Sequence, residues 1–384
     1  MLRPVSLPQD AETVVAAHPP RERAEGWSLA EAPAQSGAVE IGSPYRRGAI
    51  IAERYQLAER LGRGGMGEVW SARHLTLHTE VAVKFPSLAV RGRAATAAME
   101  RFRFEAQIAA RLGRETRHVA AVHDAGCDAA GPYLVMEYVR GPTLQQELDD
   151  RVTLSLPRVT AIVTQVAEAL AVAHAYGVVH RDLKPSNLLL ATDPAGGLLV
   201  KVADFGIAKA LRVDLGADLP GDTTGGFMLG SPPYMSPEQM AGRAAAAQGD
   251  LWSLAVIAYE GITGRLPFAG RSFAELLVSL ASGRFDAVSA LRPGLPVAVD
   301  AWFRRALAKD PARRFGSARE MAAALDLAMA GPARRSRWAG LAALRFGLFA
   351  GLLTLGPGPA PAPLGEAPGG PRSIEGQAST RDLG

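Results

Sequence analysis

The sequence predicts an α+β fold in which a small lobe of strands with one helix precedes a larger helical lobe. Short alternating segments and a glycine-rich turn lie between about residues 49 and 139, and helical patterns dominate from about residue 140 to 332. The Gly-Pro pair at 141 and 142 separates the two patterns. The segment 250–263 is apolar nearly all round, which is typical of a helix in the middle of a large lobe.

Composition limits the kinds of molecule that the chain can be. With 384 residues and 48% hydrophobic content, the chain can bury a sizeable core. The net charge of +4 is spread along the sequence without a basic stripe, so we expect no nucleic-acid partner. One cysteine, Cys127, excludes an internal disulfide framework and a multi-cysteine metal site. The folded part is therefore expected in a reducing compartment, the cytoplasm.

Both ends of the chain differ from its middle in composition. Residues 1–48 carry scattered prolines and show no sustained period, which predicts a disordered N-terminal arm. The first dozen residues contain no apolar run of the kind that a secretory signal needs. Residues 357–384 are rich in proline and glycine, and we expect a disordered tail there as well.

Residues 333–356 form a separate segment before this tail. An arginine-rich flank precedes 18 apolar residues at 338–355. This length and flank suit a single C-terminal span that would anchor a cytoplasmic domain to the inner membrane. Arg345 near the centre of the stretch opposes insertion, and an interfacial basic helix is the alternative. The sequence leaves both interpretations open.

The predicted elements follow from hydrophobic periodicity. In the small lobe, strands are predicted from Tyr55 to Trp70 around the glycine turn, up to Lys84, at 120–122 and at 133–138, with one helix over 97–112. In the large lobe, helices are predicted over 158–176, 250–263, 273–282, 296–308 and 318–329.

The glycine-rich turn joins the first two predicted strands. It contains Leu61, Gly62, Arg63, Gly64, Gly65, Met66 and Gly67, with Val69 in the following strand. Glycines at this spacing mean little alone in a chain that has 41 of them. Because a strand and not a helix follows the turn, it does not match a nicotinamide-dinucleotide site. We interpret it as a flap whose backbone N–H groups can approach phosphates closely.

Lys84 ends an alternating strand, 21 residues before Glu105 in the predicted helix. Alone, Lys84 would be a solvated lysine on an edge strand. Together with Glu105, it has a second interpretation, an ion pair that holds the ammonium against the α- and β-phosphates of a nucleotide. The chain has only five lysines among 42 basic residues, so we interpret Lys84 and Lys184 as positions that require a compact ammonium.

The run 180–187, His-Arg-Asp-Leu-Lys-Pro-Ser-Asn, carries the strongest chemical signal, and it ends on the single asparagine of the chain. Asp182 can accept the proton of an attacking hydroxyl, and Lys184 can neutralise a phosphoryl group in transfer. Asn187 can hold Mg²⁺, and Asp204, 17 residues later, supplies a carboxylate as a second ligand. Packing alone does not explain four functional side chains at fixed spacing.

Taken together, residues of about 54–330 resemble a protein kinase, specifically a bacterial eukaryotic-like (Hanks-type) serine/threonine kinase. The resemblance rests on the ordered set of the glycine turn, Val81-Ala82-Val83-Lys84, Glu105, the run 180–187, Asp204-Phe205-Gly206, Ser236-Pro237-Glu238, Asp250 and Arg314. It implies the bilobal protein-kinase fold, with a domain over 49–332, and ATP with Mg²⁺, or Mn²⁺ in its place, as cofactors.

The resemblance also implies where adenine binds. Met136 is the expected gatekeeper at the back of the adenine pocket, and the backbone of the hinge from Glu137 to Val139 is expected to bond the base. Three apolar residues are expected to sandwich the ring: Val69, Ala82 and Leu189. Lys184 beside the catalytic Asp182 is the serine/threonine-type arrangement, which makes tyrosine a less favoured acceptor.

Further roles implied by the resemblance are regulatory or structural. The segment 204–238 is similar to an activation segment, with Thr223 and Thr224 as candidate autophosphorylation sites whose phosphate Arg181 would hold. Three further positions are expected to be structural: Ser231 as a positioning hydroxyl, Glu238 with Arg314 as a buried ion pair, and Asp250 as the anchor of the catalytic loop.

The leading hypothesis is an active kinase that phosphorylates serine and threonine residues of other proteins and of itself in bacterial signalling. A pseudokinase scaffold is the alternative, although it would typically have lost Lys84, Asp182, Asn187 or Asp204, and all four are present. A small-molecule kinase of similar fold would lack the segment 230–238 that docks a peptide. No pattern in the sequence demands self-association, which trans-autophosphorylation would use.

Overall fold

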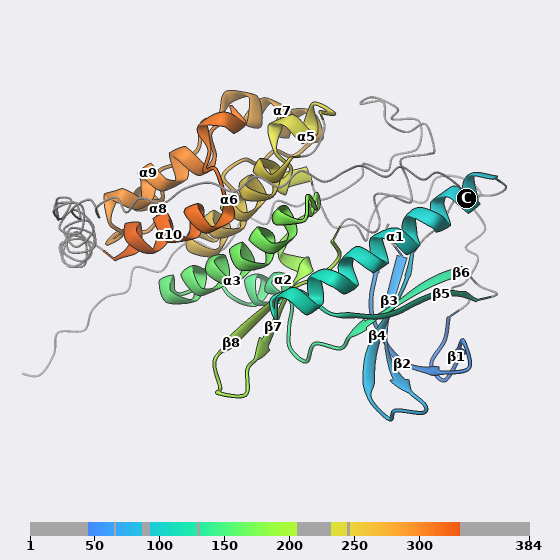
Figure 1. Cartoon of the computed structure of the whole chain (residues 1–384). Coiled ribbons are helices and arrows are strands. Elements are labelled where there is room, and N and C mark those ends of the chain that lie inside the picture. Colours follow the sequence, from blue (N-terminus) through green and yellow to red (C-terminus); the bar gives the residue numbers. More distant parts are fainter. Residues whose placement is uncertain are drawn as a thin grey trace, which may run out of the picture. The chain divides into compact units, whose positions relative to one another are not determined.

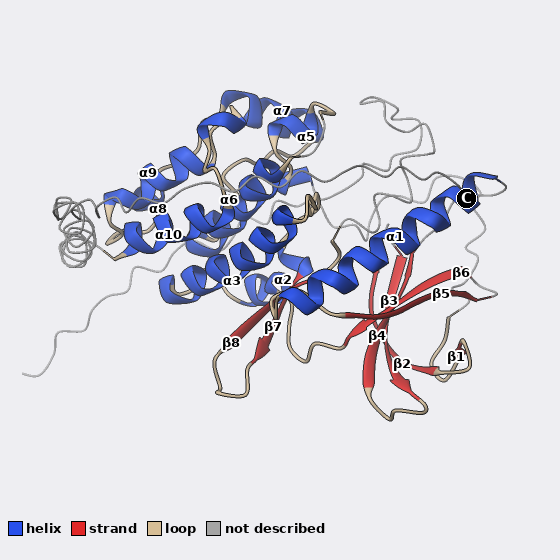
Figure 2. Ribbon diagram, in the orientation of Figure 1, coloured by secondary structure: helices blue, strands red, loops and turns tan. Residues whose placement is uncertain are grey.

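We describe a computed structural model of the chain, which covers residues 45–64, 67–86, 93–128, 131–205, 232–243 and 246–330. The backbone in these ranges forms a strand-rich part followed by a helical part (Figures 1 and 2). The described residues belong to one compact unit. The predicted α+β fold class is confirmed.

The small N-terminal lobe (the N-lobe) contains one antiparallel sheet in the order β1-β2-β3-β4-β6-β5. The larger helical lobe that follows is the C-lobe. Its strands are β1 (Ile50–Ile51), β2 (Tyr55–Gly64), β3 (Gly67–His74), β4 (Glu80–Pro86), β5 (Val122–Asp128) and β6 (Gly131–Glu137). The helix α1 (Arg93–Glu115) is inserted between β4 and β5. The predicted strand at 120–122 is a connection instead, with β5 beginning only at Val122.

The alternation of side chains along β4 explains how this sheet forms two cores. Val81, Val83 and Phe85 point into the core on the face away from α1. Ala82 points to the opposite face, where Phe102 of α1 packs against it. Lys84 has the parity of Ala82, so the strand directs its ammonium toward the α1 side, where only 3% of the residue is exposed.

The described C-lobe is built from helices around one large core. Its helices are α2 (Leu144–Asp150), α3 (Leu156–Ala175), α5 (Pro237–Met240), α6 (Ala247–Thr263), α7 (Phe273–Ser282), α8 (Val288–Leu291), α9 (Val297–Ala306) and α10 (Ala318–Met329), with 3-10 turns η1 (Pro185–Asn187), η3 (Pro232–Tyr234) and η4 (Pro311–Arg313). The predicted boundaries of α7 and α10 are confirmed to the residue. As predicted, α6 is buried nearly all round.

A small hairpin of the C-terminal part is hydrogen-bonded to the loop that follows α1. The hairpin pairs β7 (Leu188–Thr192) with β8 (Leu198–Val202) and follows the run 180–187 directly. The loop after α1 bonds to β8, because Val202 N donates to His118 O at 2.8 Å and Ala120 N donates to Val202 O at 3.0 Å. The strand that leads to Asp204 is thereby tied to the N-lobe.

The N-lobe core begins slightly before its predicted start at residue 49. The ring of Tyr45 stacks on that of Phe85 with 3.6 Å between centroids, and burial raises the pKa of Tyr45 to about 12. The rest of the predicted arm, the segments 333–356 and 357–384, and the alternatives for 338–355 lie outside the described residues.

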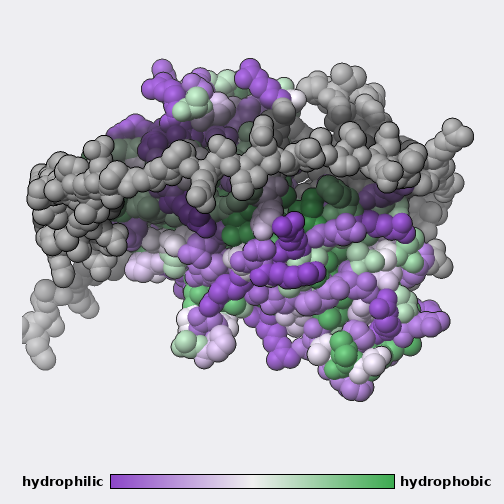
Figure 3. Space-filling view, viewed as in Figure 1, coloured by the Kyte–Doolittle hydropathy of each residue, from purple (hydrophilic) through white to green (hydrophobic). Residues whose placement is uncertain are grey.

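Among the described residues, one helix is long and apolar enough to cross a membrane. By length and composition α3 could cross a membrane, yet eight of its side chains are buried in the C-lobe. Large exposed hydrophobic side chains are scattered over separate elements, and hydrophilic residues cover most of the described face in the space-filling view (Figure 3). The apolar character of α3 therefore reflects core packing.

A buried ion pair fastens α5 to the end of the C-lobe. Arg314 donates to both carboxylate oxygens of Glu238, at 2.6 and 2.8 Å, and both residues are under 10% exposed. Burial is the largest influence and would raise the pKa of Glu238. The hydrogen bonds and charge of Arg314, together with bonds from the backbone and from Ser236, hold that pKa below its usual range. This bidentate geometry agrees with the predicted pair.

Removing the Glu238 charge is expected to be costly at neutral pH. Glu238→Gln leaves Arg314 buried without a counter-charge, so the free energy of unfolding at pH 7 should fall by about 3–5 kcal/mol. Because the pair is strongest when Glu238 is ionised, the difference between parent and variant should shrink as pH falls through the lowered pKa of Glu238. Denaturant unfolding over a pH series measures both effects.

The exposed pair of Arg305 and Glu320 gives the matched control. These side chains are 47% and 43% exposed, so Glu320→Gln should cost no more than about 1 kcal/mol. Equal losses from Glu238→Gln and Glu320→Gln would contradict the anchoring role of the buried pair.

Candidate active site

The run 180–187 forms a loop between α3 and β7 that gathers its functional side chains. Lys184 Nζ lies 2.9 Å from Asp182 Oδ2, and each of these side chains is 18% exposed. Asn187 Nδ2 donates to Asp182 O at 2.9 Å from the turn η1. Asp182 and Lys184 thus remain accessible to a substrate, while Asn187 braces the loop beneath them.

One carboxylate from α6 holds the backbone of this loop. Asp250 is 1% exposed and accepts hydrogen bonds from His180 N at 2.8 Å and from Arg181 N at 2.9 Å. His174 Nε2, on α3, lies 2.8 Å from the same carboxylate. A buried charge needs such partners, and these bonds hold the backbone immediately before Asp182.

Two residues of the site have left-handed backbone conformations. Arg181 has φ +67° and Asp204 has φ +64°. Such conformations cost non-glycine residues about 1–3 kcal/mol and persist only where the surroundings impose them. One of the two, Arg181, directly precedes Asp182, and the other is Asp204 itself. The surrounding bonds that impose these conformations therefore also position the two carboxylates.

His180 connects these two positions. Its Nε2 lies 2.9 Å from Ala203 O, and because a carbonyl only accepts, Nε2 must donate. In the neutral ring Nδ1 is then an acceptor, and Asp182 N donates to it at 3.3 Å. His180 therefore links the backbone of Asp182 to the residue before Asp204, and its ring packs on Phe205 at 4.7 Å.

Lys84 reaches Asp204 across the lobes. The distance from Lys84 Nζ to Asp204 Oδ1 is 2.7 Å. Burial is the largest influence on the Asp204 carboxyl and would raise its pKa. The charge and hydrogen bond of Lys84, with smaller contributions from His180 and Lys184, together bring the pKa below its ordinary value. Asp204 is thus held as a carboxylate. Glu105 lies on the face of α1 that also carries Phe102 and Ala106, turned toward the sheet.

Asn187 and Asp204 form a donor set that suits a hard divalent cation. Asn187 O accepts from Ala203 N at 2.9 Å, which places the two side chains on neighbouring backbone. Because Nδ2 of Asn187 is used on Asp182 O, its amide oxygen is the atom left for a metal. No group of three or more His, Cys, Asp or Glu among the described residues could hold an ion alone. Phosphate oxygens would complete the coordination of Mg²⁺.

The three described glycines of the flap differ in what surrounds them. A Cβ on Gly62 or Gly64 would meet nothing within 4 Å, which leaves room for a ligand over β2. Gly67 has φ +121°, and a Cβ there would overlap the carbonyl oxygen of Phe85 on β4. Gly67 is therefore required by strand packing, whereas the space next to Gly62 and Gly64 is open. Gly65 and Met66 lie outside the described residues.

The expected adenine-binding residues are partly brought together. Val69, Ala82 and Met136 belong to one cluster under the sheet, whereas Leu189 lies half-buried on β7. Leu61 is 46% exposed, Arg63 is exposed, and Val139 follows β6 half-buried.

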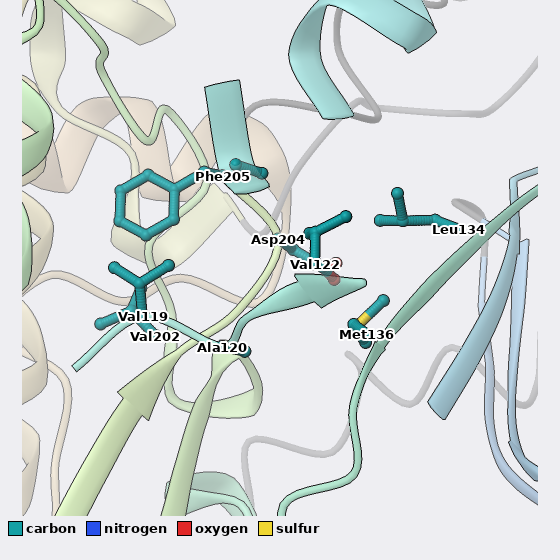
Figure 4. Close-up of a pocket in the computed structure, with 9 residues that line it drawn as sticks. Val119, Ala120, Val122, Leu134, Met136, Val202, Asp204 and Phe205 are labelled. Carbon is teal, nitrogen blue, oxygen red and sulfur yellow. The ribbon is translucent and has the colours of Figure 1, made fainter. Parts of the chain in front are cut away.

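A cavity of about 10 Å³ lies next to Met136, with Val119 and Phe205 on one side and Leu134 on the other (Figure 4).

Lys201 is a site residue that the sequence reasoning missed. Its Nζ donates to Glu137 Oε2 at 2.7 Å, and the same oxygen accepts from Ala121 N at 3.2 Å. The expected hinge is thereby tied to β8, three residues before Asp204. The scarcity of lysine that drew attention to Lys84 and Lys184 applied to Lys201 as well and could have identified it.

The described part of the expected activation segment is its end. Ser236 forms a capping box with Gln239 at the start of α5, and Tyr234 donates to Glu260 at 2.7 Å. Burial raises the pKa of Tyr234 well above its usual value, so its hydroxyl stays a donor. Gly206, Thr223, Thr224 and Ser231 lie outside the described residues.

Comparison with known proteins agrees with this geometry. The protein kinase domain family model matches residues 55–322. The chain belongs to the protein kinase family. It is 37% identical over 302 residues to the serine/threonine-protein kinase Pkn1 of Myxococcus xanthus, covering 76% of this chain and 41% of Pkn1. It is 39% identical over 289 residues to PknB of Mycobacterium tuberculosis, covering 72% and 43%.

A solved structure shows the same fold. The PknI kinase domain of Mycobacterium tuberculosis superposes with a TM-score of 0.56 at 32% identity, covering 75% of this chain and 99% of that chain. The predicted kinase fold and the predicted likeness to bacterial Hanks-type kinases are confirmed. The chain spans less than half the length of the curated relatives that it matches.

The two kinds of glycine in the flap should respond differently to a methyl group. Gly67→Ala should lower the free energy of unfolding by about 1–3 kcal/mol, because a left-handed backbone and the Phe85 carbonyl both oppose a Cβ. Gly62→Ala should stay within about 0.5 kcal/mol of the parent, since it meets open space. Thermal unfolding of the two variants tests this, and equal stability would contradict the packing role of Gly67.

Proposed function

We propose that this chain is a serine/threonine protein kinase that transfers the γ-phosphoryl group of ATP to hydroxyls of proteins, including its own. The observation that carries the proposal is the convergence of Asp182, Lys184, Asn187 and the Lys84–Asp204 pair on one site. Such transfer depends mainly on positioning and on charge stabilisation, and these residues supply both.

Each residue of the loop has a distinct task in the proposed transfer. Asp182 orients the attacking hydroxyl and accepts its proton. Lys184, 2.9 Å from Asp182, stabilises the negative charge that develops on the transferring group. The hydrogen bond from Asn187 to Asp182 O holds the loop backbone that carries both Asp182 and Lys184.

Nucleotide binding falls to the N-lobe and to the residues next to it. Lys84, positioned with Glu105, holds the α- and β-phosphates under the glycine flap, and Glu137 to Val139 bond the base through their backbone. Asn187 and Asp204 would hold Mg²⁺, and Mn²⁺ is an expected substitute. When bound, the metal neutralises phosphate charge. Because Lys84 keeps the pKa of Asp204 low, that ligand is ready as a carboxylate at neutral pH.

Regulation by the activation segment is part of the proposal. Thr223 and Thr224 are the candidate autophosphorylation sites. The Arg181 side chain is exposed beside Asp182 and can form a charge-assisted pair with a phosphate on that segment. Ser231 positions the acceptor near Asp182 and Lys184. Self-association would serve phosphorylation between copies.

The expected partners are proteins with serine or threonine acceptors in bacterial signalling. Ser236, Glu238 and the C-lobe around them are the described part of the peptide-docking region. Attachment to the membrane through 338–355 stays a prediction, as does a cytoplasmic kinase domain.

Asp182→Asn should abolish autophosphorylation without unfolding the protein. Replacing the carboxylate removes the proton acceptor, so the rate of transfer should fall at least about 100-fold. Full-length parent and variant are incubated with Mg²⁺-ATP and a generic basic protein, and phosphate is located by mass spectrometry. Phosphate on Thr223 or Thr224 in the parent alone is expected. A folded parent that binds ATP but phosphorylates neither itself nor the acceptor would contradict the proposal in favour of a scaffold.

A further inference from the structure

The side-chain amide of Gln239 bridges α5 and the catalytic loop. Its Nε2 donates to Arg181 O at 3.0 Å, 58 residues away in sequence. Its Oε1 accepts from Ser236 N and Ser236 Oγ, both at 3.0 Å. The partners fix the orientation of the amide, because a carbonyl can only accept and a backbone N–H can only donate. The amide nitrogen of Gln239 therefore bonds to the catalytic loop, and its amide oxygen bonds to Ser236 at the start of α5.

The residue at the far end of this bridge is strained. Arg181 has φ +67° and directly precedes Asp182. Asp250 Oδ1 holds its N–H at 2.9 Å, and Gln239 holds its carbonyl. Both polar groups of the strained residue are thus bonded to side chains of other elements, α6 and α5. Such a conformation persists only while surrounding bonds impose it.

The near end of the bridge is anchored. Glu238, the preceding residue, is clamped by two hydrogen bonds from Arg314. The capping box with Ser236, which is fully buried, fixes the first turn of α5. Gly249 of α6 lies against the amide, so that a Cβ there would come within 3.4 Å of Gln239 Oε1. Gln239 has little freedom to follow the loop if the loop moves.

We propose that Gln239 is a positioning residue for phosphoryl transfer, which holds the Arg181 carbonyl from α5 and thereby aims Asp182. This inference rests on the proposed kinase function. Without the bond from Gln239, the peptide between Arg181 and Asp182 is held on one side only. The carboxylate of Asp182 then loses alignment, while the nucleotide contacts of Lys84 and the hinge stay intact.

Gln239→Glu separates this role from the helix cap. The variant has the same shape, and its carboxylate still accepts from Ser236, but it has no N–H to donate to Arg181 O. Ser236→Ala is the structural counterpart, since it weakens the cap and leaves the donor in place. Gln56→Glu, at an exposed position on β2, controls for the added charge.

The experiment measures kcat and KM for ATP on a generic basic protein, with unfolding temperature and hydrogen exchange of residues 178–184, for the full-length parent and the three variants. Gln239→Glu should lower kcat about tenfold, the size expected for one lost hydrogen bond, at unchanged KM. Exchange of the catalytic loop should become faster in Gln239→Glu only. Ser236→Ala should lower the unfolding temperature while exchange of the catalytic loop stays parental, and Gln56→Glu should match the parent.

Parental kcat and exchange in Gln239→Glu would overturn the inference while leaving the kinase function standing. Equally faster exchange of the catalytic loop in Gln239→Glu and Ser236→Ala would also overturn it, because the effect would then belong to the cap. A folded parent that transfers no phosphate would overturn the proposed function, and the catalytic role of Gln239 with it.

Discussion

The buried carboxylate of Asp250 is the constraint on which the rest of the site depends. It lies on α6, the most thoroughly buried helix described in the C-lobe, and it accepts hydrogen bonds from His180 N and Arg181 N. A carboxylate in such a place is stable only with these donors, and the left-handed turn at Arg181 is stable only with this acceptor. Through the Asp250 side chain, the C-lobe core thus holds the backbone that directly precedes Asp182.

Two ion pairs around the site join segments that are far apart in the sequence. Lys84 on β4 pairs with Asp204 after β8, and Lys201 on β8 pairs with Glu137 at the end of β6. These contacts join the N-lobe to the strand that carries the expected metal ligand. A compact ammonium serves each contact. Three of the five lysines of this arginine-rich chain, Lys84, Lys184 and Lys201, lie where nucleotide chemistry is proposed.

The sequence was sufficient to predict the fold class, the helices α7 and α10 and the residues that the loop 180–187 brings together, because side-chain chemistry at fixed spacing carries that information. It was insufficient for the left-handed backbone at Arg181 and Asp204, which only tertiary hydrogen bonds impose. The short helix α2 was missed although Thr143 and Gln146 show the spacing of a capping box. Contacts such as Gln239 with Arg181 join residues too distant in sequence for any local pattern to reveal.

The most direct test of this account is the kcat of Asp250→Asn, measured at a temperature where parent and variant are both folded. Asparagine preserves shape but replaces one acceptor oxygen with a donor that faces a backbone N–H. If the carboxylate fixes the catalytic loop, kcat should fall about 10- to 100-fold, in line with loss of a charged hydrogen bond. A folded Asp250→Asn protein with the parental kcat would contradict the claim that this side chain aims Asp182.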